Sequence, residues 1–322
     1  MSHITNRLMM LLGALFVASI LYASPAAAQA TRTWISGVGD DVNPCSRTAP
    51  CKTFAGAISK TAAGGEIDCL DPGGFGTVTI TKSITLDCRE TEGSILASGT
   101  SGINVNGANI VVVLRGLSIN GAGTTPGTYG IHVFQAQSVT VEDSYIFGFG
   151  SGAGRGISVD TTSSNVQLFV NNTTINNNTG GGIVLQPSAG FSAGADLNNV
   201  RLLGNGVAGL ALSTASGATA LSATMTNSQI AGGGVAGASG IVAKAPTGTA
   251  TIVIKSSSIS GNPVYGINSN GAGAAVRVGD TAITNNGTAL NAVNSAKLES
   301  FGDNDVTGNT SPGAFTGTIS HS

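Results

Sequence analysis

The stretch Val139-Thr140-Val141-Glu142-Asp143-Ser144-Tyr145-Ile146 decides the fold, because its pattern recurs along the chain. When Ile146 is taken as an anchor, apolar residues stand five and seven positions before it, and a small or polar turn-former stands three before it. In the last repeat Phe301 takes the position five before the anchor, and Glu299 breaks the apolar rule seven before it. Successive anchors are 23 to 29 residues apart. They are Ile119, Ile146, Ile175, Leu202, Ile230, Ile259, Ile283 and Val306.

Short strands with this repeat length predict a parallel β-helix. Apolar and polar residues alternate with a period of two from residue 67 onward, and after most anchors a second Gly-Ile or Gly-Leu strand follows, as at Gly156-Ile157. A propeller blade needs about 40 residues, which is too many for this repeat. In a parallel β-helix each coil stacks on the previous one at about 4.8 Å, so inward side chains form apolar columns. We therefore expect an all-β solenoid over residues 67–309.

The turn-formers three before the anchors are expected to form a structural polar ladder. Stacked Asn side chains can pass hydrogen bonds from coil to coil, and Asn tolerates the backbone conformation of a tight bend. We prefer this structural role to a catalytic one for Asp143, Asn172, Asn199 and Asn227.

Residues 1–30 have the features of a cleaved signal peptide. Arg7 precedes an apolar run from Leu8 to Leu21, and Ala28-Gln29-Ala30 offers a small-x-small cleavage site. The run is too short for a membrane anchor of roughly 20 apolar residues. We expect a secreted or periplasmic protein with no membrane insertion after cleavage.

Residues 31–66 are expected to close the first coil. A short strand at 33–36 and a turn-rich loop lead into an amphipathic helix at 53–62, capped by Thr53. Such stacks need a terminal unit that covers their first layer. Residues 310–322 are expected to form a C-terminal tail.

The four cysteines, Cys45, Cys51, Cys69 and Cys88, are even in number, which suggests disulfides in an exported chain. The most local pairing joins Cys45 to Cys51 and Cys69 to Cys88, although three pairings are formally possible. A zinc site is disfavoured because the spacings do not match paired C-x2–4-C motifs. No metal or cofactor is predicted.

The composition excludes several classes of protein. The chain has 48 glycines, 9% charged residues and a formal net charge of −2. A low charged fraction disfavours both disorder and an ordinary helix-rich protein. No basic patch is visible, so nucleic acid is not an expected partner.

The segments Trp34-Ile35-Ser36, Gly39-Asp40-Asp41-Val42-Asn43-Pro44 and Pro50-Cys51-Lys52-Thr53-Phe54 resemble the start of secreted bacterial right-handed parallel β-helix repeat proteins. The repeat body resembles the pectin lyase-like superfamily. The resemblance implies a right-handed parallel β-helix with an N-terminal capping helix. It implies little about function, because this architecture hosts lyases, hydrolases, adhesins and other surface proteins.

The catalytic motifs of the family's hydrolases are absent, and the acids are scattered, so no catalytic residue is predicted. Arg115 and Glu142 align in neighbouring coils, and an exposed ion pair is preferred to an acid–base couple. His132, between Ile131 and Val133, is expected to be an exposed residue pointing outward without a role.

Exposed aromatic residues favour binding over catalysis. Tyr145 and Phe147 flank the inward Ile146 and should face out, and Phe149 and Phe169 should do so as well. Exposed rings on a flat sheet can stack on sugars. The candidate binding residues are Tyr145, Phe147, Phe169, Arg155 as a rim contact, and Glu142.

We therefore predict a non-catalytic protein that presents a sheet face to an extracellular polysaccharide or a surface protein. Two alternatives remain open. One is a carbohydrate-active enzyme, a polysaccharide lyase or glycoside hydrolase, with a divergent site. The other is a structural component of an envelope assembly.

Overall fold

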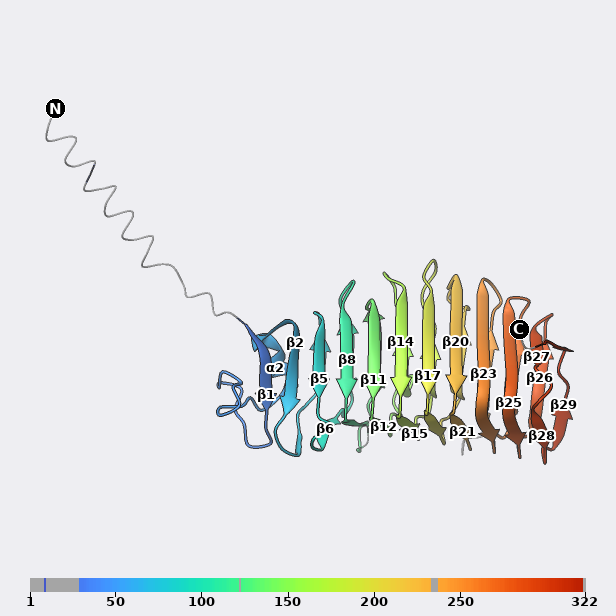
Figure 1. Ribbon diagram of the computed structural model, residues 1–322, viewed down its shortest axis with the longest axis horizontal. Helices are drawn as coiled ribbons and strands as arrows, with labels where there is room; N and C mark the ends of the chain where they lie inside the picture. Colours follow the sequence, from blue (N-terminus) through green and yellow to red (C-terminus); the bar gives the residue numbers. More distant parts are fainter. Residues whose placement is uncertain (1–8, 10–28, 122, 233–236, 321–322) are drawn as a thin grey trace.

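The computed structural model describes Met9 and residues 29–121, 123–232 and 237–320. The predicted signal sequence, apart from Met9 and residues 29–30, lies outside the described residues. Figure 1 shows the remainder as an elongated rod, in which the strands stand side by side from the N-terminal to the C-terminal end.

The rod is a parallel β-solenoid, as the repeat predicts. Its strands form one 20-stranded and one 10-stranded sheet. The larger sheet covers two faces of the rod, because the long strands β23 (Thr249–Ser260) and β25 (Ala274–Thr284) run from one face onto the other. We number the three faces in the order in which the chain crosses them after strand β10 (Tyr129–Gln135).

The first face contains β1 (Ala30–Ile35), β2 (Thr61–Cys69), β5 (Ile84–Asp87), β8 (Val111–Arg115), β11 (Ser138–Glu142), β14 (Val166–Asn171), β17 (Ala193–Asn198), β20 (Ala220–Thr226), β23 (Thr249–Ser260), β25 (Ala274–Thr284), β27 (Lys297–Ser300) and β30 (Gly317–Thr318). The second face contains β3 (Gly73–Gly74), β6 (Gly93–Leu96), β9 (Leu117–Asn120), β12 (Tyr145–Phe147), β15 (Thr174–Asn176), β18 (Arg201–Leu203), β21 (Gln229–Ala231), the ends of β23 and β25, and β28 (Asp305–Thr307). The third face contains β4 (Val78–Ile80), β7 (Ile103–Asn106), β10 (Tyr129–Gln135), β13 (Arg155–Val159), β16 (Gly181–Leu185), β19 (Ala208–Ser213), β22 (Ser239–Lys244), β24 (Tyr265–Asn270), β26 (Thr288–Val293) and β29 (Ser311–Gly313).

The predicted register is confirmed at the anchors. Ile146 pairs with Ile119 on one side and with Ile175 on the other. The same column continues through Leu202 to Val306, and its members up to Ile283 are buried. Because the side chains of a strand alternate between its two faces, this single column sets which residues enter the core.

The last coil departs from the predicted alignment by one residue. Val278 pairs with Ser300 rather than Phe301, and Leu298 is the buried partner of Val276. This register keeps Glu299 out of the core, where a carboxylate would be costly. Phe301 was predicted to be inward, but it lies beside the Lys255 ammonium, which is 5.1 Å from its ring centroid.

The corner between the first and second faces is a left-handed bend. Asp143 has a φ of 51° and Asn172 a φ of 44°, and their counterparts in the other coils share this conformation. Asn and Asp adopt it at lower cost than other residues with a side chain. The corner residues are Gly116, Asp143, Asn172, Asn199, Asn227, Ser256 and Asp280.

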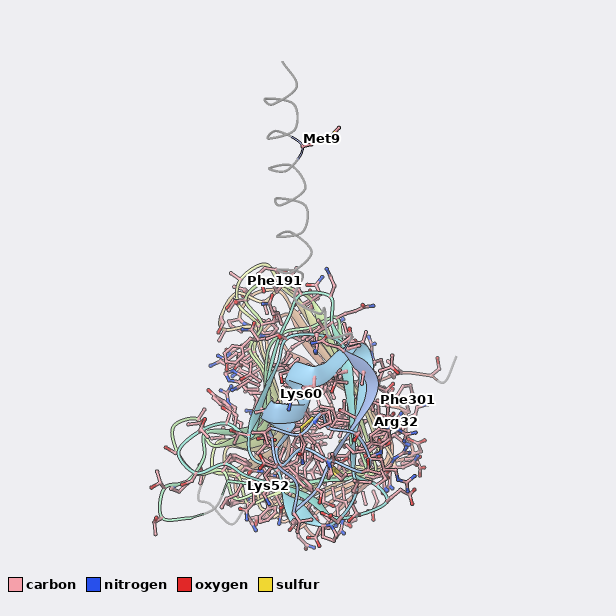
Figure 2. All side chains as sticks on the ribbon, turned by 90° about the vertical axis from the view of Figure 1, so that its left-hand side faces the viewer. Met9, Arg32, Lys52, Lys60, Phe191 and Phe301 are labelled. Atoms are coloured by element: carbon pink, nitrogen blue, oxygen red, sulfur yellow. A yellow bond between two sulfur atoms is a disulfide. The ribbon has the colours of Figure 1, made fainter. Side chains whose placement is uncertain are left out.

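The helix α2 (Phe54–Lys60) lies across the N-terminal end of the stack (Figure 2). Phe54 and Ala57 are fully buried, and the Thr53 hydroxyl accepts a hydrogen bond from the Gly56 amide. The helix ends at Lys60, two residues before the predicted end at Ala62. Thr61 already belongs to β2, where it pairs with Ala30 of β1 and its hydroxyl bonds the Thr33 hydroxyl.

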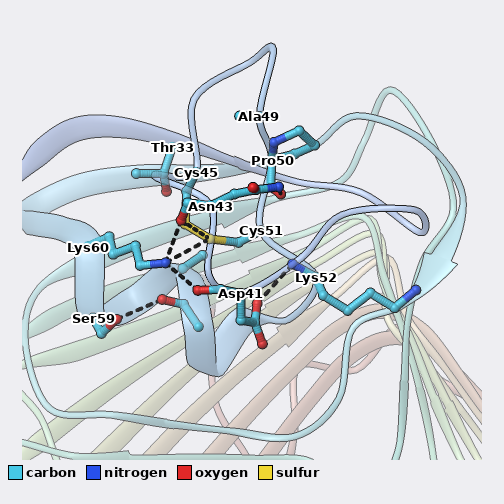
Figure 3. The surroundings of a disulfide bond; sticks show 12 residues. Thr33, Asp41, Asn43, Cys45, Ala49, Pro50, Cys51, Lys52, Ser59 and Lys60 are labelled. Atoms are coloured by element: carbon cyan, nitrogen blue, oxygen red, sulfur yellow. Dashed lines mark hydrogen bonds between the residues drawn. A yellow bond between two sulfur atoms is a disulfide. The ribbon is translucent and has the colours of Figure 1, made fainter.

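The local disulfide pairing is confirmed. Cys45 is bonded to Cys51 and Cys69 to Cys88, with Cα separations of 4.6 and 4.9 Å. In Figure 3 the Lys60 ammonium reaches from α2 to the Cys45–Cys51 loop, where it donates to the carbonyls of Asp41 and Asn43. The first disulfide and the helix therefore hold one another in place.

The solenoid extends beyond residue 309, where a tail was predicted. Both β29 and β30 continue the pairing, and the Ser311 amide donates to the Gly287 carbonyl. No helix in the described ranges is long and apolar enough to span a membrane.

Replacing the buried Met225 by aspartate should destabilise the rod strongly. Met225 is fully buried between Leu197 and Ile254. The loss should reach at least the roughly 2–5 kcal/mol of a large-to-small truncation, and the buried charge should add to it. Thr224→Asp, which faces outward on the same strand, is the control in a thermal melt. Equal melting temperatures for the two variants would contradict the register.

Removing the second disulfide should cost more stability than removing the first. The Cys69–Cys88 bridge spans 19 residues and the Cys45–Cys51 bridge spans six. Loss of the longer loop should cost roughly 2–5 kcal/mol, and loss of the shorter one about 1 kcal/mol less. The double alanine variants can be compared by denaturant unfolding. An unchanged free energy of unfolding for the Cys69→Ala/Cys88→Ala variant would overturn the prediction.

Candidate functional site

Two of the predicted aromatic residues form an exposed ring pair on the second face. Tyr145 and Phe147 flank the buried Ile146 on β12, and their ring centroids are 4.6 Å apart. Tyr145 is 40% exposed. Two adjacent, partly exposed rings of this kind provide an apolar surface with a polar tip, the Tyr145 hydroxyl.

Phe169 lies apart from this ring pair. It faces outward from β14 on the first face, where it pairs with Thr140 and Asp196. The left-handed corner at Asp143 separates the two faces. The aromatic residues therefore do not form the single patch that the sequence suggested.

Phe149 was predicted to face outward, but it is fully buried. Its amide donates to the side-chain oxygen of Asn178, a buried residue of the next coil. The chain turns at Gly148, which has a φ of 78°, so the alternation that begins on β12 does not continue to Phe149. The ring then fills the space beside Gly121 and Gly130.

Phe149 marks the start of an inner asparagine ladder that sequence reasoning missed. The Asn178 amide donates to the Asn205 oxygen at 3.0 Å, and Asn286 and Asn309 repeat the same contact. The signal was present, because these residues stand three positions after their anchors. They are Asn178, Asn205, Asn262, Asn286 and Asn309.

The outer corner residues also bond from coil to coil. The Asn172 side-chain amide donates to Asp143 at 2.6 Å, and Asn199 donates to Asn172 at 2.9 Å. Asn227 instead donates to Asn198, the neighbour of Asn199. The bond from Asn172 gives the Asp143 carboxylate a structural role.

Arg115 and Glu142 form the ion pair expected from their alignment. The Arg115 Nε donates to a Glu142 oxygen at 2.7 Å, and both side chains are about 30% exposed or less. Arg115 also lies 3.8 Å from Asp87, which Arg89 contacts at 2.6 Å. Glu142 is therefore part of a charge network along the first face.

Two adjacent hollows open along this charge network, and neither was apparent from the repeat. The first, of about 470 Å³, is lined by Arg89, Glu90, Glu92, Asp143 and Tyr145 among others. The second, of about 520 Å³, extends toward Trp34 and Arg32. The hollows share Arg89 and Glu90, so they lie side by side. We call the two hollows together the charged groove.

His132 is buried, contrary to the prediction of an exposed side chain. It is 9% exposed and lies on β10 between the rings of Tyr129 and Phe134, whose centroids are 4.0 and 3.9 Å away. Its Nε2 is 3.2 Å from an oxygen of Asp160, although the geometry is not that of a hydrogen bond. The two neighbouring aromatic side chains are what cover this outward position.

Asp160 organises the residues around His132. The Ser158 hydroxyl donates to Asp160 at 2.8 Å, and Arg155 donates to Asp160 at 3.2 Å and to Gln186 at 3.2 Å. Arg155 is thus bound within the third face and is not a rim contact for Tyr145. The recurring Gly-Ile strands placed His132 beside Ser158, and only the fold added Asp160 and Arg155.

The cluster around His132 and Asp160 contains side chains of the kinds found in catalytic sites, but it is closed to a substrate. The imidazole nitrogen that faces Asp160 is buried, so a substrate cannot reach it in this conformation. Among the described residues there is no group of three His, Cys, Asp or Glu side chains arranged to hold a metal ion.

The pKa of the Asp87 carboxyl group in the charged groove is lower than its ordinary value. Burial by itself would raise the pKa of its carboxyl group, but hydrogen bonds from Arg89 and the charges of Arg89 and Arg115 outweigh burial and lower this pKa. A carboxylate with a lowered folded-state pKa stabilises the fold above its ordinary pKa, and this contribution is lost as the pH falls through the folded value.

Asp87→Asn should therefore lower the free energy of unfolding at pH 7. The difference from the unchanged protein should shrink as the pH falls below the ordinary carboxyl pKa of 3.8. Urea unfolding at a series of pH values measures this, with the exposed Asp305→Asn as the control. If the Asp87→Asn variant and the unchanged protein differ in free energy of unfolding by the same amount at every pH, the charge of Asp87 does not contribute to stability.

Comparisons with known proteins agree with the fold. The family model for the right-handed β-helix region matches residues 74–230. The structure of pectate lyase Pel9A aligns with a TM-score of 0.64 at 17% identity, covering 88% of this chain and 81% of that chain. A rhamnogalacturonan lyase aligns with a TM-score of 0.51 at 12% identity, covering 83% of this chain and 75% of that chain. A sequence comparison with curated proteins finds no match. The chain is a right-handed parallel β-helix protein with the pectin lyase-like fold.

Proposed function

We propose that this protein binds a polysaccharide on its surface, with the ring pair Tyr145–Phe147 as a stacking contact. The exposed Tyr145 ring carries the proposal, because it lines the charged groove as well as the second face. A sugar ring placed against it would have polar side chains within reach in the same hollow. This combination of an apolar platform with convergent polar groups is typical of small-molecule and sugar sites.

A carbohydrate-active enzyme is the second candidate. The similar solved structures carry the names of two lyases that act on polysaccharides, and this favours a carbohydrate as the ligand. The residues themselves favour binding without catalysis. Arg115 and Glu142 neutralise one another in a direct ion pair, and the imidazole of His132 is covered.

An extracellular or periplasmic location is part of the proposal. The two disulfides suit an oxidising compartment, where such bonds persist. Large external polysaccharides would be accessible to the rod there. A surface protein as the ligand, or a place in an envelope assembly, remains an alternative outcome of the binding test.

Electrophoresis through gels that contain neutral, acidic or amino-sugar polysaccharides tests the proposal. At least one polysaccharide should retard the protein, and Tyr145→Ala should weaken this binding by about 0.5–1.5 kcal/mol, roughly 2- to 13-fold in affinity. Tyr265→Ala, on β24 of the third face, is the matched control. The absence of retardation by every polysaccharide would refute the proposal.

A parallel assay of product release separates the two candidates. The purified protein is incubated with each polysaccharide, and new reducing ends and unsaturated products are measured. A non-catalytic protein should release none. Product release that persists in an independent preparation and falls in the Tyr145→Ala variant would replace the binding proposal with the enzyme.

A further inference from the structure

The charged groove is bounded by an aromatic ring at each end. Trp34 stands at one end on β1 and Tyr145 at the other on β12. Trp34 pairs with Asp68, and the same column continues through Asp87 and Arg115 to Glu142, in the coil of Tyr145. Four steps of about 4.8 Å separate the two rings by about 19 Å along the rod. A ligand that contacts both rings must therefore be a chain of several sugars.

Carboxylates outnumber guanidinium groups in this groove. Its walls contain three arginines, Arg32, Arg47 and Arg89. They also contain six acids, which are Glu66, Asp68, Asp87, Glu90, Glu92 and Asp143. The groove thus carries three more negative than positive charges at neutral pH.

Most of the positive charge is already engaged. Arg32 contacts both Glu66 and Asp68, and its guanidinium carbon lies 5.7 Å from the Trp34 ring centroid. Arg89 is bonded to Asp87 at 2.6 Å. Arginines held in this way have little capacity left to bind the carboxylates of an acidic ligand.

Acids outnumber bases among the charges of the groove that are exposed and form no ion pair in the described part of the chain, because the acids include Glu90 and Glu92 and the sole base is Arg47. The side chains of Glu90 and Glu92 are exposed, and within the described residues neither forms an ion pair. Burial raises the pKa of Glu66, and the neighbouring Asp68 carboxylate adds to this effect. A groove with an excess of one sign of charge attracts the opposite sign and repels its own.

We infer that the charged groove binds a glycan without carboxylates and prefers one with free amino groups. The inference rests on the proposed polysaccharide binding and names its ligand class. The rings of Trp34 and Tyr145 stack on the sugars, and Glu90 and Glu92 contact the ammonium groups of the ligand. A polyuronate meets net repulsion from the excess of acids in the groove.

Three hexasaccharides of equal length test the ligand class by calorimetry at low ionic strength. They are hexamers of glucosamine, of N-acetylglucosamine and of galacturonic acid. The glucosamine hexamer should bind most tightly, the N-acetylated hexamer less tightly and the galacturonic acid hexamer least. Added salt should weaken the first interaction more than the second, because salt screens exposed charges.

The double variant Glu90→Gln/Glu92→Gln tests whether these two carboxylates bind the ammonium groups of the ligand. Its affinity for the glucosamine hexamer should fall by about 2- to 30-fold, as expected for the loss of two exposed ion pairs. Its affinity for the N-acetylated hexamer should not change. Asp305→Asn removes an exposed acid far from the groove and should change neither affinity.

The outcomes separate this inference from the proposed function. If the galacturonic acid hexamer binds as tightly as the glucosamine hexamer, or if the double variant binds both amino sugars as before, the ligand class is wrong. Binding of any hexamer that Tyr145→Ala weakens would still support the proposed function. If no hexamer binds, the ligand class is overturned, and retardation by any polysaccharide in the gel test would still support the proposed function.

Discussion

Stacking of parallel coils at about 4.8 Å is the constraint on which the rest of the structure depends. Every strand pairs with an equivalent strand on each side, so each corner must have the same backbone geometry in successive coils. The left-handed corner at Asp143 and Asn172 is the visible result. A corner of another shape would displace its coil and break the apolar columns, which explains why Gly, Asn, Asp or Ser occupies this position.

The same constraint aligns equivalent residues of successive coils in long rows on the outside of the rod. A residue and its counterpart one coil later lie one strand spacing apart, so charges that are distant in sequence become neighbours. Asp87, Arg115 and Glu142 form such a row. The groove along the first coils arises because this row continues beside the exposed loop of Arg89 and Glu90, next to the second disulfide.

Side-chain alternation predicted the fold well and the surface only in part. The anchors and the first-face strands followed from the repeat because one buried face specifies the register. Alternation failed where the chain left a strand, as at Phe149, and where a one-residue slip kept an acid outside, as at Phe301. It also placed His132 outward correctly but could not show that neighbouring rings cover it.

By itself the sequence determined the coil and its corners and favoured the local disulfide pairing, because each depends on residues close together in the chain or on a regular repeat. The tertiary structure decided what the outside of the rod presents. It separated Phe169 from Tyr145, bound Arg155 to Asp160, and placed Trp34 and Tyr145 in two adjoining hollows. The physical reason is that a surface site depends on loops and side-chain directions across several coils, and these do not follow the repeat.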